Sequence, residues 1–400
     1  MALLHYHFSA SFTSACIIGK LAFLDLSKKN QLMKHLFTYL FFLIHVIHYG
    51  QQISTSIMHD NMQRDYILYV PSSYDPTVSI PLVFGFHGYT SNALVNLTYT
   101  RLKNIADTAG FIVVHPQGSL NSIGNTHWNV GLPGSSSVDD VGFTNALMDS
   151  LISQYNIDQS RIYACGMSNG GYMSFLLGCQ LSHRVAAIAS ITGSMTLSTF
   201  NNCNPQRPVP VLQIHGTQDS TVPYNGNVTW SKSIDDVIQY WVNFNNCNAT
   251  PTVTNLPDLV STDGSTVIHY EYSGGNNGSE VAHFKVIDGG HDWPGVWGNL
   301  DIDASIEIWR FFSRFNIYGP VSTSISSTEK DAFTLYPRIC DNQIIVISDK
   351  KETYAIYDLN GKHIVHGVLK NGENIISVQP YAKGTYIMVT NHRKEKFFVQ

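Results

Sequence analysis

The chain has 400 residues, of which 44% are hydrophobic and 13% are charged, and its formal net charge is −5. This composition allows a sizeable core and excludes a largely disordered chain. The acidic balance argues against nucleic acid as a main partner, since phosphate binding needs a basic surface. None of the six cysteines forms a Cys-x-x-Cys pair, so no structural zinc site is predicted.

A targeting signal begins at Met33 rather than at Met1. Lys34 supplies a short positive region, and an apolar run of 12 residues follows it at 36–47. These proportions are typical of a secretory signal peptide over 33–50 and are too short for a comfortable membrane span. A buried helix or a membrane anchor is the alternative. We expect residues 1–32 to come from an upstream start codon, and the mature chain to have no stable membrane span.

From Tyr66 onwards, strands alternate with helices. Strands are predicted over residues 66–70, 81–87, 111–116, 161–166, 185–193, 209–216, 266–273 and 282–288. Helices are predicted over 96–109, 139–155, the residues after Ser168, 233–245 and 302–315. This alternation predicts a mostly parallel sheet with helices on both faces, an α/β domain over 51–318.

The composition of the chain and its predicted secondary structure change at about residue 319. Residues 319–334 are rich in Gly, Pro, Ser and Thr, which is typical of a linker. Residues 335–400 then contain only short strands, separated by turn signals such as Asn360-Gly361 and Asn371-Gly372. Short, evenly spaced strands predict a small C-terminal all-β sandwich.

Ser168 lies in Gly166-Met167-Ser168-Asn169-Gly170, between a predicted strand and a predicted helix. A Gly-x-Ser-x-Gly turn in that context holds a nucleophilic serine above the sheet, and its glycines avoid clashes with neighbouring elements. An ordinary serine in a glycine-rich loop is the alternative. The context favours the nucleophile.

A serine nucleophile needs a base that is oriented by an acid, and in this fold the chain order is Ser, Asp or Glu, then His. Asp219 follows the strand at 209–216, and His291 follows the strand at 282–288. Asp235 and Asp236 are weaker candidates because they fall in a predicted helix. His283 is the rival base, but it falls inside a strand, which favours a structural role.

Acyl transfer also requires N–H donors aimed at the developing oxyanion. The residue after the nucleophile supplies one such donor, here the backbone N–H of Asn169. The loop after the strand at 81–87 supplies the other, for which we favour Tyr89, with Gly88 giving the backbone room. His87 precedes the serine in the chain, so we expect it to bond loop backbone.

Together these segments resemble the secreted polyhydroxybutyrate depolymerase/feruloyl esterase-like α/β-hydrolases, close to carbohydrate esterase family 1. The matching stretches include "PLVFGFHGYTSNA", "RIYACGMSNGGYMS", "PVPVLQIHGTQDSTVPYNG" and "DGGHDWPG", within about residues 60–316. The resemblance implies an α/β-hydrolase fold and a serine esterase with the triad Ser168, Asp219 and His291. It also implies an aromatic side chain in the acyl pocket. Trp128 and Trp293 are our candidates, with core packing as the alternative for both.

The tail resembles the C-terminal sorting domain of the Bacteroidetes type IX secretion system. The similarity rests on "LYP" at 335–337, "YAIYDLNGKHI" at 354–364, "YAKGTYIMVT" at 381–390 and the end "KEKFFVQ". It implies the type IX machinery as a partner, and a secreted or cell-surface location. In an exported chain cysteines can pair, and Cys203 with Cys247 is one candidate pair, with Cys179 as a competing partner.

We therefore expect a secreted serine carboxylesterase that needs no metal or organic cofactor. Its expected substrates are feruloyl or acetyl esters, attached to plant polysaccharide. One alternative is an extracellular polyhydroxyalkanoate depolymerase. Such depolymerases usually carry an added polymer-binding domain, whereas the extra domain expected here resembles a sorting signal. An alternative of another class is a non-catalytic binding protein on a hydrolase scaffold, although all three triad positions are filled.

Overall fold

The computed structural model describes residues 50–321, 334–336, 339–340, 342–348, 350–358, 362–390 and 394–399. The chain divides between residues 321 and 322 into two compact units. The predicted signal peptide, apart from Gly50, and residues 322–333 of the predicted linker lie outside the described residues.

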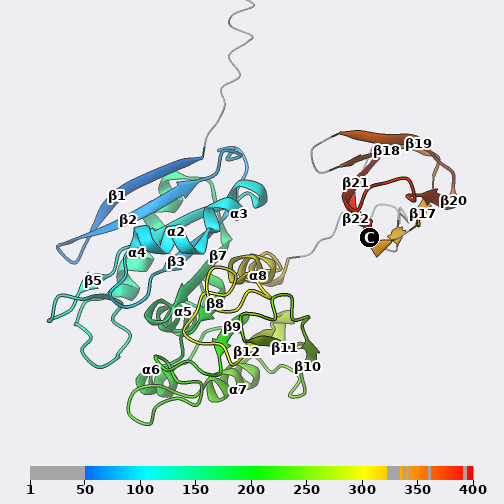
Figure 1. The fold of residues 1–400 in the computed structure, drawn as a ribbon. Coiled ribbons are helices and arrows are strands. Elements are labelled where there is room, and N and C mark those ends of the chain that lie inside the picture. Colours follow the sequence, from blue (N-terminus) through cyan, green and yellow to red (C-terminus); the bar gives the residue numbers. More distant parts are fainter. Residues whose placement is uncertain are drawn as a thin grey trace, which may run out of the picture. The chain divides into compact units, whose positions relative to one another are not determined.

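A ten-stranded sheet forms the centre of the first unit, in the order β1-β2-β4-β3-β7-β8-β9-β12-β11-β10 (Figure 1). Its strands are β1 (Gln51–His59), β2 (Met62–Val70), β3 (Ile80–Phe86), β4 (Ile112–Pro116), β7 (Ile157–Met167), β8 (Val185–Ile191), β9 (Val211–Gly216), β10 (Thr252–Asn255), β11 (Thr266–Tyr272) and β12 (Val281–Ile287). The strands from β4 through β12 pair in parallel, and antiparallel strands flank both edges. The prediction of a mostly parallel sheet is confirmed.

Helices cover both faces of this sheet (Figure 1). They are α2 (Ala93–Thr100), α3 (Leu102–Ala109), α4 (Asp140–Gln154), α5 (Asn169–Gln180), α6 (Leu197–Asn202), α7 (Ile234–Phe244) and α8 (Ala304–Phe312). Apolar side chains of α4, α5 and α7 join one buried cluster, and those of α3 and α8 join the cluster on the other face. Continuous apolar strands such as β3 are buried on both faces for this reason.

Several local elements differ from the prediction. The helix predicted over 96–109 is two helices, because Arg101 has φ 51° in the left-handed region and interrupts the turns between α2 and α3. Gly110, with φ 72°, ends α3 as expected. Strand β1 was not predicted, since its sequence QQISTSIMH is mostly polar and its side chains are largely exposed at the sheet edge.

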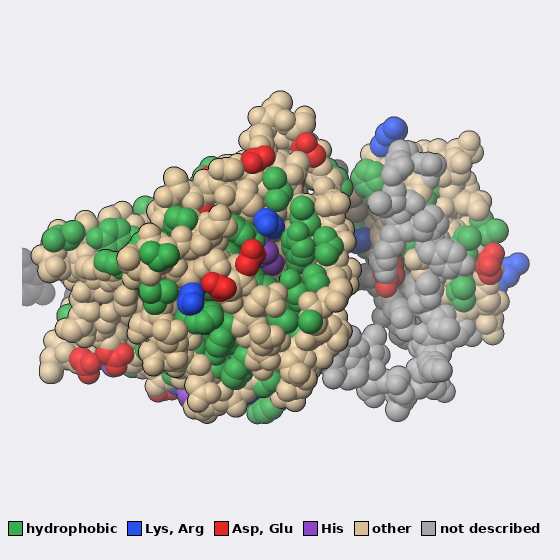
Figure 2. Space-filling view, turned by 90° about the horizontal axis from the view of Figure 1, so that it is seen from below, with side chains coloured by type: hydrophobic (Ala, Val, Ile, Leu, Met, Phe, Trp, Pro, Cys, Tyr) green, Lys and Arg blue, Asp and Glu red, His purple; other side chains and the backbone are tan. Residues whose placement is uncertain are grey.

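Charged side chains are sparse on the face shown in Figure 2, most of which is hydrophobic or uncharged. This agrees with the charged fraction of 13%. Among the residues that the structure describes, none of the helices has both the length and the apolar character that crossing a bilayer requires.

The second unit is all-β, as predicted. One sheet has the order β15-β17-β20 and the other β16-β22-β21-β18-β19. The strands are β15 (Thr334–Tyr336), β16 (Ile339–Cys340), β17 (Gln343–Ser348), β18 (Glu352–Asp358), β19 (His363–Leu369), β20 (Gly372–Ser377), β21 (Gly384–Thr390) and β22 (Lys394–Val399). Both sheets contribute to one buried cluster that includes Ile344, Val346, Ile356 and Met388. Residues 319 and 320, the start of the predicted linker, instead pair with Phe315–Asn316.

Candidate active site

Ser168 lies at a sharp turn between β7 and α5. Its backbone has φ 55° and ψ −120°, and its N–H donates to the carbonyl of Ile191 at 2.8 Å. A Cβ atom on Gly166 would lie 2.5 Å from the Gly170 carbonyl carbon, and one on Gly170 would lie 2.1 Å from the Phe86 carbonyl oxygen. Only glycine fits these two positions, and the strained turn holds the half-buried Ser168 side chain at the end of the strand.

Asp219 and His291 come from loops that follow neighbouring parallel strands, β9 and β12. Because the carboxyl ends of parallel strands meet at one edge of the sheet, both loops lie at the same edge as the Ser168 turn. The Nδ1 atom of His291 lies 2.7 Å from Oδ2 of Asp219. The Asp219 side chain is fully buried, whereas 22% of the His291 side chain is exposed.

The Asp219 carboxylate is held as an anion. Burial alone would raise the pKa of Asp219, but hydrogen bonds from His215, His291 and the Val222 N–H outweigh burial and hold this pKa well below its ordinary value. A permanently charged carboxylate orients His291 Nδ1–H towards itself and leaves Nε2 free to accept a proton.

Within the described part of the chain, Ser168 Oγ makes no hydrogen bond. The bond between nucleophile and base is often long before substrate binds and shortens in the complex. The structure therefore places Ser168 on the same edge as the Asp219–His291 pair, and its proton transfer to His291 stays a prediction.

The predicted oxyanion residues flank Ser168. A Cβ on Gly88 would lie 3.6 Å from Ser168 Cβ, so the Gly88-Tyr89 segment runs beside the nucleophile. The Tyr89 N–H donates to no other described residue. Asn169 is the first residue of α5, where a backbone N–H has no partner within the helix. Both N–H groups are available to an oxyanion.

Trp128 joins the two oxyanion segments. Its backbone N–H donates to Oδ1 of Asn169 at 2.6 Å, and its carbonyl accepts from Nδ2 of Asn169 at 3.1 Å. Its indole Nε1–H donates to the carbonyl of His87 at 2.9 Å, next to Gly88. Trp128 thus fixes the first turn of α5 and the loop after β3 relative to each other.

Comparison with known proteins shows to which family the chain is related. Residues 64–202 match the family described as Esterase PHB depolymerase. Feruloyl esterase C of Emericella nidulans is 30% identical over 251 residues, which cover 62% of this chain and 83% of that protein. The chain belongs to the Esterase PHB depolymerase family. This is a family of carboxylic ester hydrolases that is related to feruloyl and acetylxylan esterases.

Two further similarities concern acetylxylan esterases. The bifunctional acetylxylan esterase/xylanase of Neocallimastix patriciarum is 28% identical over 261 residues, which cover 65% of this esterase but only 35% of that protein. Among solved structures, an acetyl xylan esterase from Aspergillus awamori matches with a TM-score of 0.48 and 14% identity, over 66% of this chain and 99% of that one.

Both tryptophans predicted to contact substrate lie in the core of the esterase. Trp128 and Trp293 have no exposed surface. Trp293 donates its indole N–H to Ser305 Oγ at 3.1 Å and packs edge-on against Tyr99. Neither can touch a ligand in this structure, so the core-packing alternative describes both side chains.

A pocket of about 270 Å³ adjoins the oxyanion residues instead. It is lined by Tyr89, His127, Leu132, Pro133, Gly134, Ser135, Asn169 and Trp230. The Tyr89 hydroxyl accepts from Nδ2 of Asn121 at 3.0 Å and of Asn125 at 2.9 Å, which holds the ring in place. Sequence reasoning missed Trp230 and Leu132, because nothing near them in the sequence marks a site.

Two other histidines have structural roles. His87 is buried, lies 2.7 Å from the Gly88 carbonyl through Nδ1, and accepts the Gly118 N–H at 2.9 Å, as expected for a residue that bonds loop backbone. Burial lowers the pKa of His87 to about 4. His283, the rival base, is also buried, and its ring nitrogens lie 3.0 Å from the Tyr224 hydroxyl and 3.2 Å from the Gln213 carbonyl.

The cysteine pairing differs from the first candidate pair. Cys179 at the end of α5 forms a disulfide with Cys203 after α6. Cys247 is a free thiol, and its Sγ lies 3.7 Å from the Ser279 carbonyl. The competing pairing is thus the one formed, because α5 and α6 end close together.

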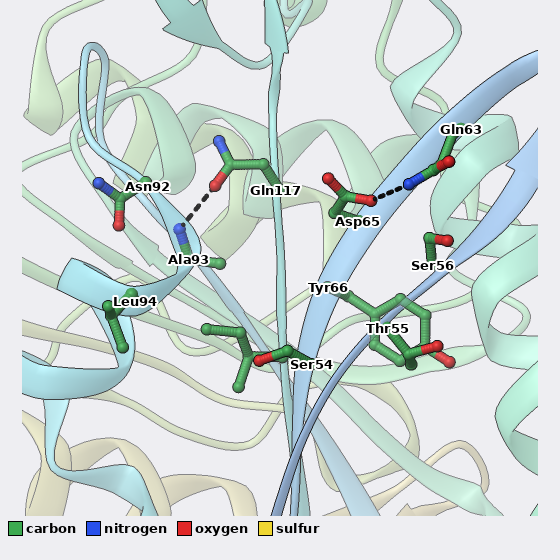
Figure 3. Close-up of a pocket in the computed structure, with 11 residues that line it drawn as sticks. Ser54, Thr55, Ser56, Gln63, Asp65, Tyr66, Asn92, Ala93, Leu94 and Gln117 are labelled. Carbon is green, nitrogen blue, oxygen red and sulfur yellow. Dashed lines mark hydrogen bonds between the residues drawn. The ribbon is translucent and has the colours of Figure 1, made fainter.

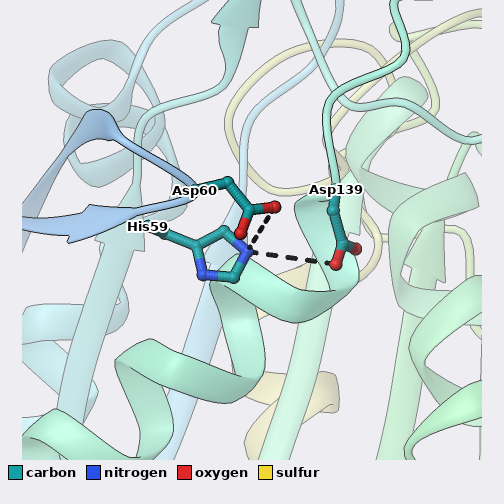
Figure 4. Close-up of side chains that lie close together, drawn as sticks. All are labelled: His59, Asp60 and Asp139. Carbon is teal, nitrogen blue, oxygen red and sulfur yellow. Dashed lines mark ion pairs between the residues drawn. The ribbon is translucent and has the colours of Figure 1, made fainter.

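Two features away from the predicted residues have structural explanations. Nε2 of His59 lies 3.6 Å from Asp60 and 3.9 Å from Asp139, whose carboxylate also caps α4 by accepting the Gly142 N–H at 2.8 Å (Figure 4). This cluster joins the β1–β2 turn to α4. A hollow of about 440 Å³ lies between the β1–β2 ribbon and the start of α2, where Oε1 of Gln117 accepts the Ala93 N–H (Figure 3). None of the predicted site residues lines it.

Proposed function

We propose that this chain is a serine carboxylesterase with Ser168 as nucleophile, His291 as base and Asp219 as the orienting acid. The observation that carries this proposal is the 2.7 Å contact between His291 Nδ1 and the buried Asp219 carboxylate, on the sheet edge where Ser168 occupies a left-handed turn. A non-catalytic scaffold would have no need to keep this strained backbone.

The proposed reaction has two steps. His291 Nε2 takes the proton of Ser168 Oγ as this oxygen bonds to the ester carbonyl carbon, and the N–H groups of Tyr89 and Asn169 stabilise the oxyanion that forms. The carbon–oxygen bond to the alcohol breaks, and the alcohol leaves with the proton from His291. Water then gives a proton to His291 and attacks the acyl carbon. The bond from this carbon to Ser168 Oγ breaks, Oγ takes the proton back from His291, and the acid is released.

We propose feruloyl-type esters on plant polysaccharide as the preferred substrates, with acetyl esters second. The pocket of about 270 Å³ beside Tyr89 and Asn169 supports this order, because Leu132, Pro133 and Trp230 offer apolar and aromatic surface to a ring. An acetyl group would leave most of this volume unfilled. The relatives named as feruloyl and acetylxylan esterases agree with both options.

Polyhydroxyalkanoate depolymerisation is the second candidate, favoured by the description of the matching family. Its substrate carries a short aliphatic acyl unit rather than a ring. A film of polyhydroxybutyrate therefore belongs in the same set of assays.

We further propose that the esterase is exported, with a signal peptide starting at Met33 and the C-terminal unit as a type IX sorting domain. The disulfide between Cys179 and Cys203 supports an oxidising compartment. N-terminal sequencing of secreted material tests this proposal. A mature chain that retains residues 1–32 would contradict it.

The deciding experiment assays purified enzyme on methyl ferulate, acetylated xylan and polyhydroxybutyrate film, beside the Ser168→Ala variant. We expect the highest kcat/KM on methyl ferulate. The variant should lose at least ~10³-fold in kcat on p-nitrophenyl acetate while remaining folded. An unchanged rate would exclude Ser168 as the nucleophile, whereas preference for the film would favour the second candidate.

A further inference from the structure

A second histidine lies against the carboxylate of the proposed triad. His215 is the next-to-last residue of β9, and its side chain has no exposed surface. Its Nε2 lies 3.3 Å from Oδ2 of Asp219, the same oxygen that lies 2.7 Å from His291. The roles proposed for Ser168, His291 and the oxyanion donors make no use of this buried group.

The hydrogen bonds around His215 determine where its proton lies. The Gln213 side-chain amide donates to the Gly193 carbonyl at 2.9 Å, which fixes its nitrogen, rather than its oxygen, on that side. The same nitrogen lies 3.0 Å from Nδ1 of His215. An amide nitrogen only donates, so Nδ1 is the acceptor and the imidazole proton is on Nε2.

The Nε2–H of His215 therefore donates to the Val222 carbonyl at 2.8 Å, and Oδ2 of Asp219 lies 3.3 Å from the same nitrogen. The other carboxylate oxygen, Oδ1, accepts the N–H groups of Thr221 and Val222, each at 2.8 Å. The Nε2 atom of His215 thus contacts both the backbone of this loop, at Val222, and the carboxylate of Asp219. Rotation of the carboxylate would break bonds on both oxygens.

We propose that His215 is a positioning residue, which donates from Nε2 to Asp219 and keeps Oδ2 directed at His291. This inference rests on the proposed function, in which Asp219 orients the base. His215 touches no reacting atom and acts only through Asp219. Gln213 assists it by holding the tautomer that can donate.

The polar side chains next to His215 bond partners other than Asp219. Tyr224 packs edge-on against its ring, with centroids 5.9 Å apart, and directs its hydroxyl to Asp235 at 2.8 Å. His283 on the neighbouring strand β12 bonds that hydroxyl and the Gln213 carbonyl. Neither bonds Asp219. Within the described residues, His215 and His291 are the two side chains whose nitrogens lie within 3.3 Å of this carboxylate.

The test compares a variant that keeps a donor with one that removes it. In His215→Gln the side-chain nitrogen replaces Nε2 as an N–H donor, whereas His215→Leu fills the space without one. Hydrolysis of p-nitrophenyl acetate gives kcat and KM, and urea unfolding gives stability. His283→Gln and His283→Leu are the matched control, since His283 is a buried histidine of the adjacent strand that does not contact Asp219.

We expect His215→Leu to lower kcat about 10- to 100-fold with KM nearly unchanged, the range for losing a hydrogen bond to a charged group. His215→Gln should recover most of this loss even if both variants are equally destabilised. The His283 pair should change stability without this difference in kcat. Equal kcat for His215→Leu and His215→Gln, at any level, would overturn the proposal.

Ser168→Ala, assayed in parallel, separates the two proposals. If Ser168→Ala is inactive and His215→Leu keeps the wild-type kcat, only the role of His215 is wrong. If Ser168→Ala retains activity, the proposed function itself is wrong. If neither His215 variant folds, kcat of Gln213→Leu decides, because it removes the donor to Nδ1 and leaves His215 in place: an unchanged kcat overturns the proposal.

Discussion

The two halves of the candidate site are held by different kinds of force. On the acid–base side, the Asp219 carboxylate receives hydrogen bonds from His291 and two backbone N–H groups, and Nε2 of His215 lies 3.3 Å from it. On the nucleophile side, Ser168 Oγ has no partner within the described residues, and backbone sterics at Gly166 and Gly170 set its position. The first half should therefore be sensitive to loss of polar groups, and the second to changes in volume and backbone placement.

The largest expected effect comes from breaking the acid–base half at Asp219. Asp219→Asn keeps the shape but removes the charge and favours the wrong tautomer of His291. We expect kcat on p-nitrophenyl acetate to fall about 10⁴-fold with little change in KM. Asp235→Asn is the control, since among the described residues that carboxylate bonds only the Tyr224 hydroxyl, and its kcat should stay at the wild-type value. A loss below about tenfold for Asp219→Asn would contradict the proposed pairing.

The second prediction concerns the loss of stability at acidic pH, which we assign to His87 in the nucleophile half. The folded pKa of His87 is about 4, lowered from 6.5 by burial. The unfolded chain therefore takes up this proton at higher pH than the folded one, so stability is complete above about pH 6.5 and falls as pH drops towards 4. Protonation of His87 should account for roughly 3 kcal/mol of the loss in the free energy of unfolding.

Urea unfolding at several pH values between 7 and 4 measures this slope. His87→Gln keeps a donor and an acceptor and should flatten the curve. His183→Gln, at an exposed position, should leave the curve unchanged. Identical slopes for wild type and His87→Gln would show that His87 does not carry the effect.

The smallest effect is expected for Trp128→Phe. Phe keeps the packing against Phe86 but leaves the His87 carbonyl without its donor. We expect kcat to fall about tenfold and the free energy of unfolding to fall by about 1–3 kcal/mol. Trp241→Phe is the control, because that indole nitrogen is buried and has no hydrogen-bond partner in the part of the chain that the structure describes. Its substitution should leave kcat unchanged, and an equal loss in both variants would remove the special role of Trp128.

The sheet could be predicted because long apolar runs such as residues 81–87 are buried on both faces and alternate with amphipathic helices. The polar edge strand β1 could not, since its stability comes from pairing with β2 and not from burial of its own side chains. Nothing in the sequence around Arg101 indicates that this residue adopts a left-handed backbone and divides one helix into two.

Within the site, residues that follow strand ends were predictable, because the chain order of Ser168, Asp219 and His291 is a property of the sequence. Contacts between distant segments were not. The sequence around Trp128 and Trp293 does not indicate that both side chains are fully buried. Likewise, the sequence around Trp230 does not indicate that it lines the pocket. The pairing of Cys179 with Cys203 depends on where two helices end, which the spacing of cysteines does not reveal.

The hydrogen bonds of Trp128 should affect how tightly the site binds a transition state. Because one residue bonds both the Asn169 side chain and the His87 carbonyl, it links the two segments that carry the proposed oxyanion donors. A tetrahedral inhibitor would meet donors that are already in place, so little conformational entropy is lost when it binds. A change at Trp128 should therefore displace both proposed donors together.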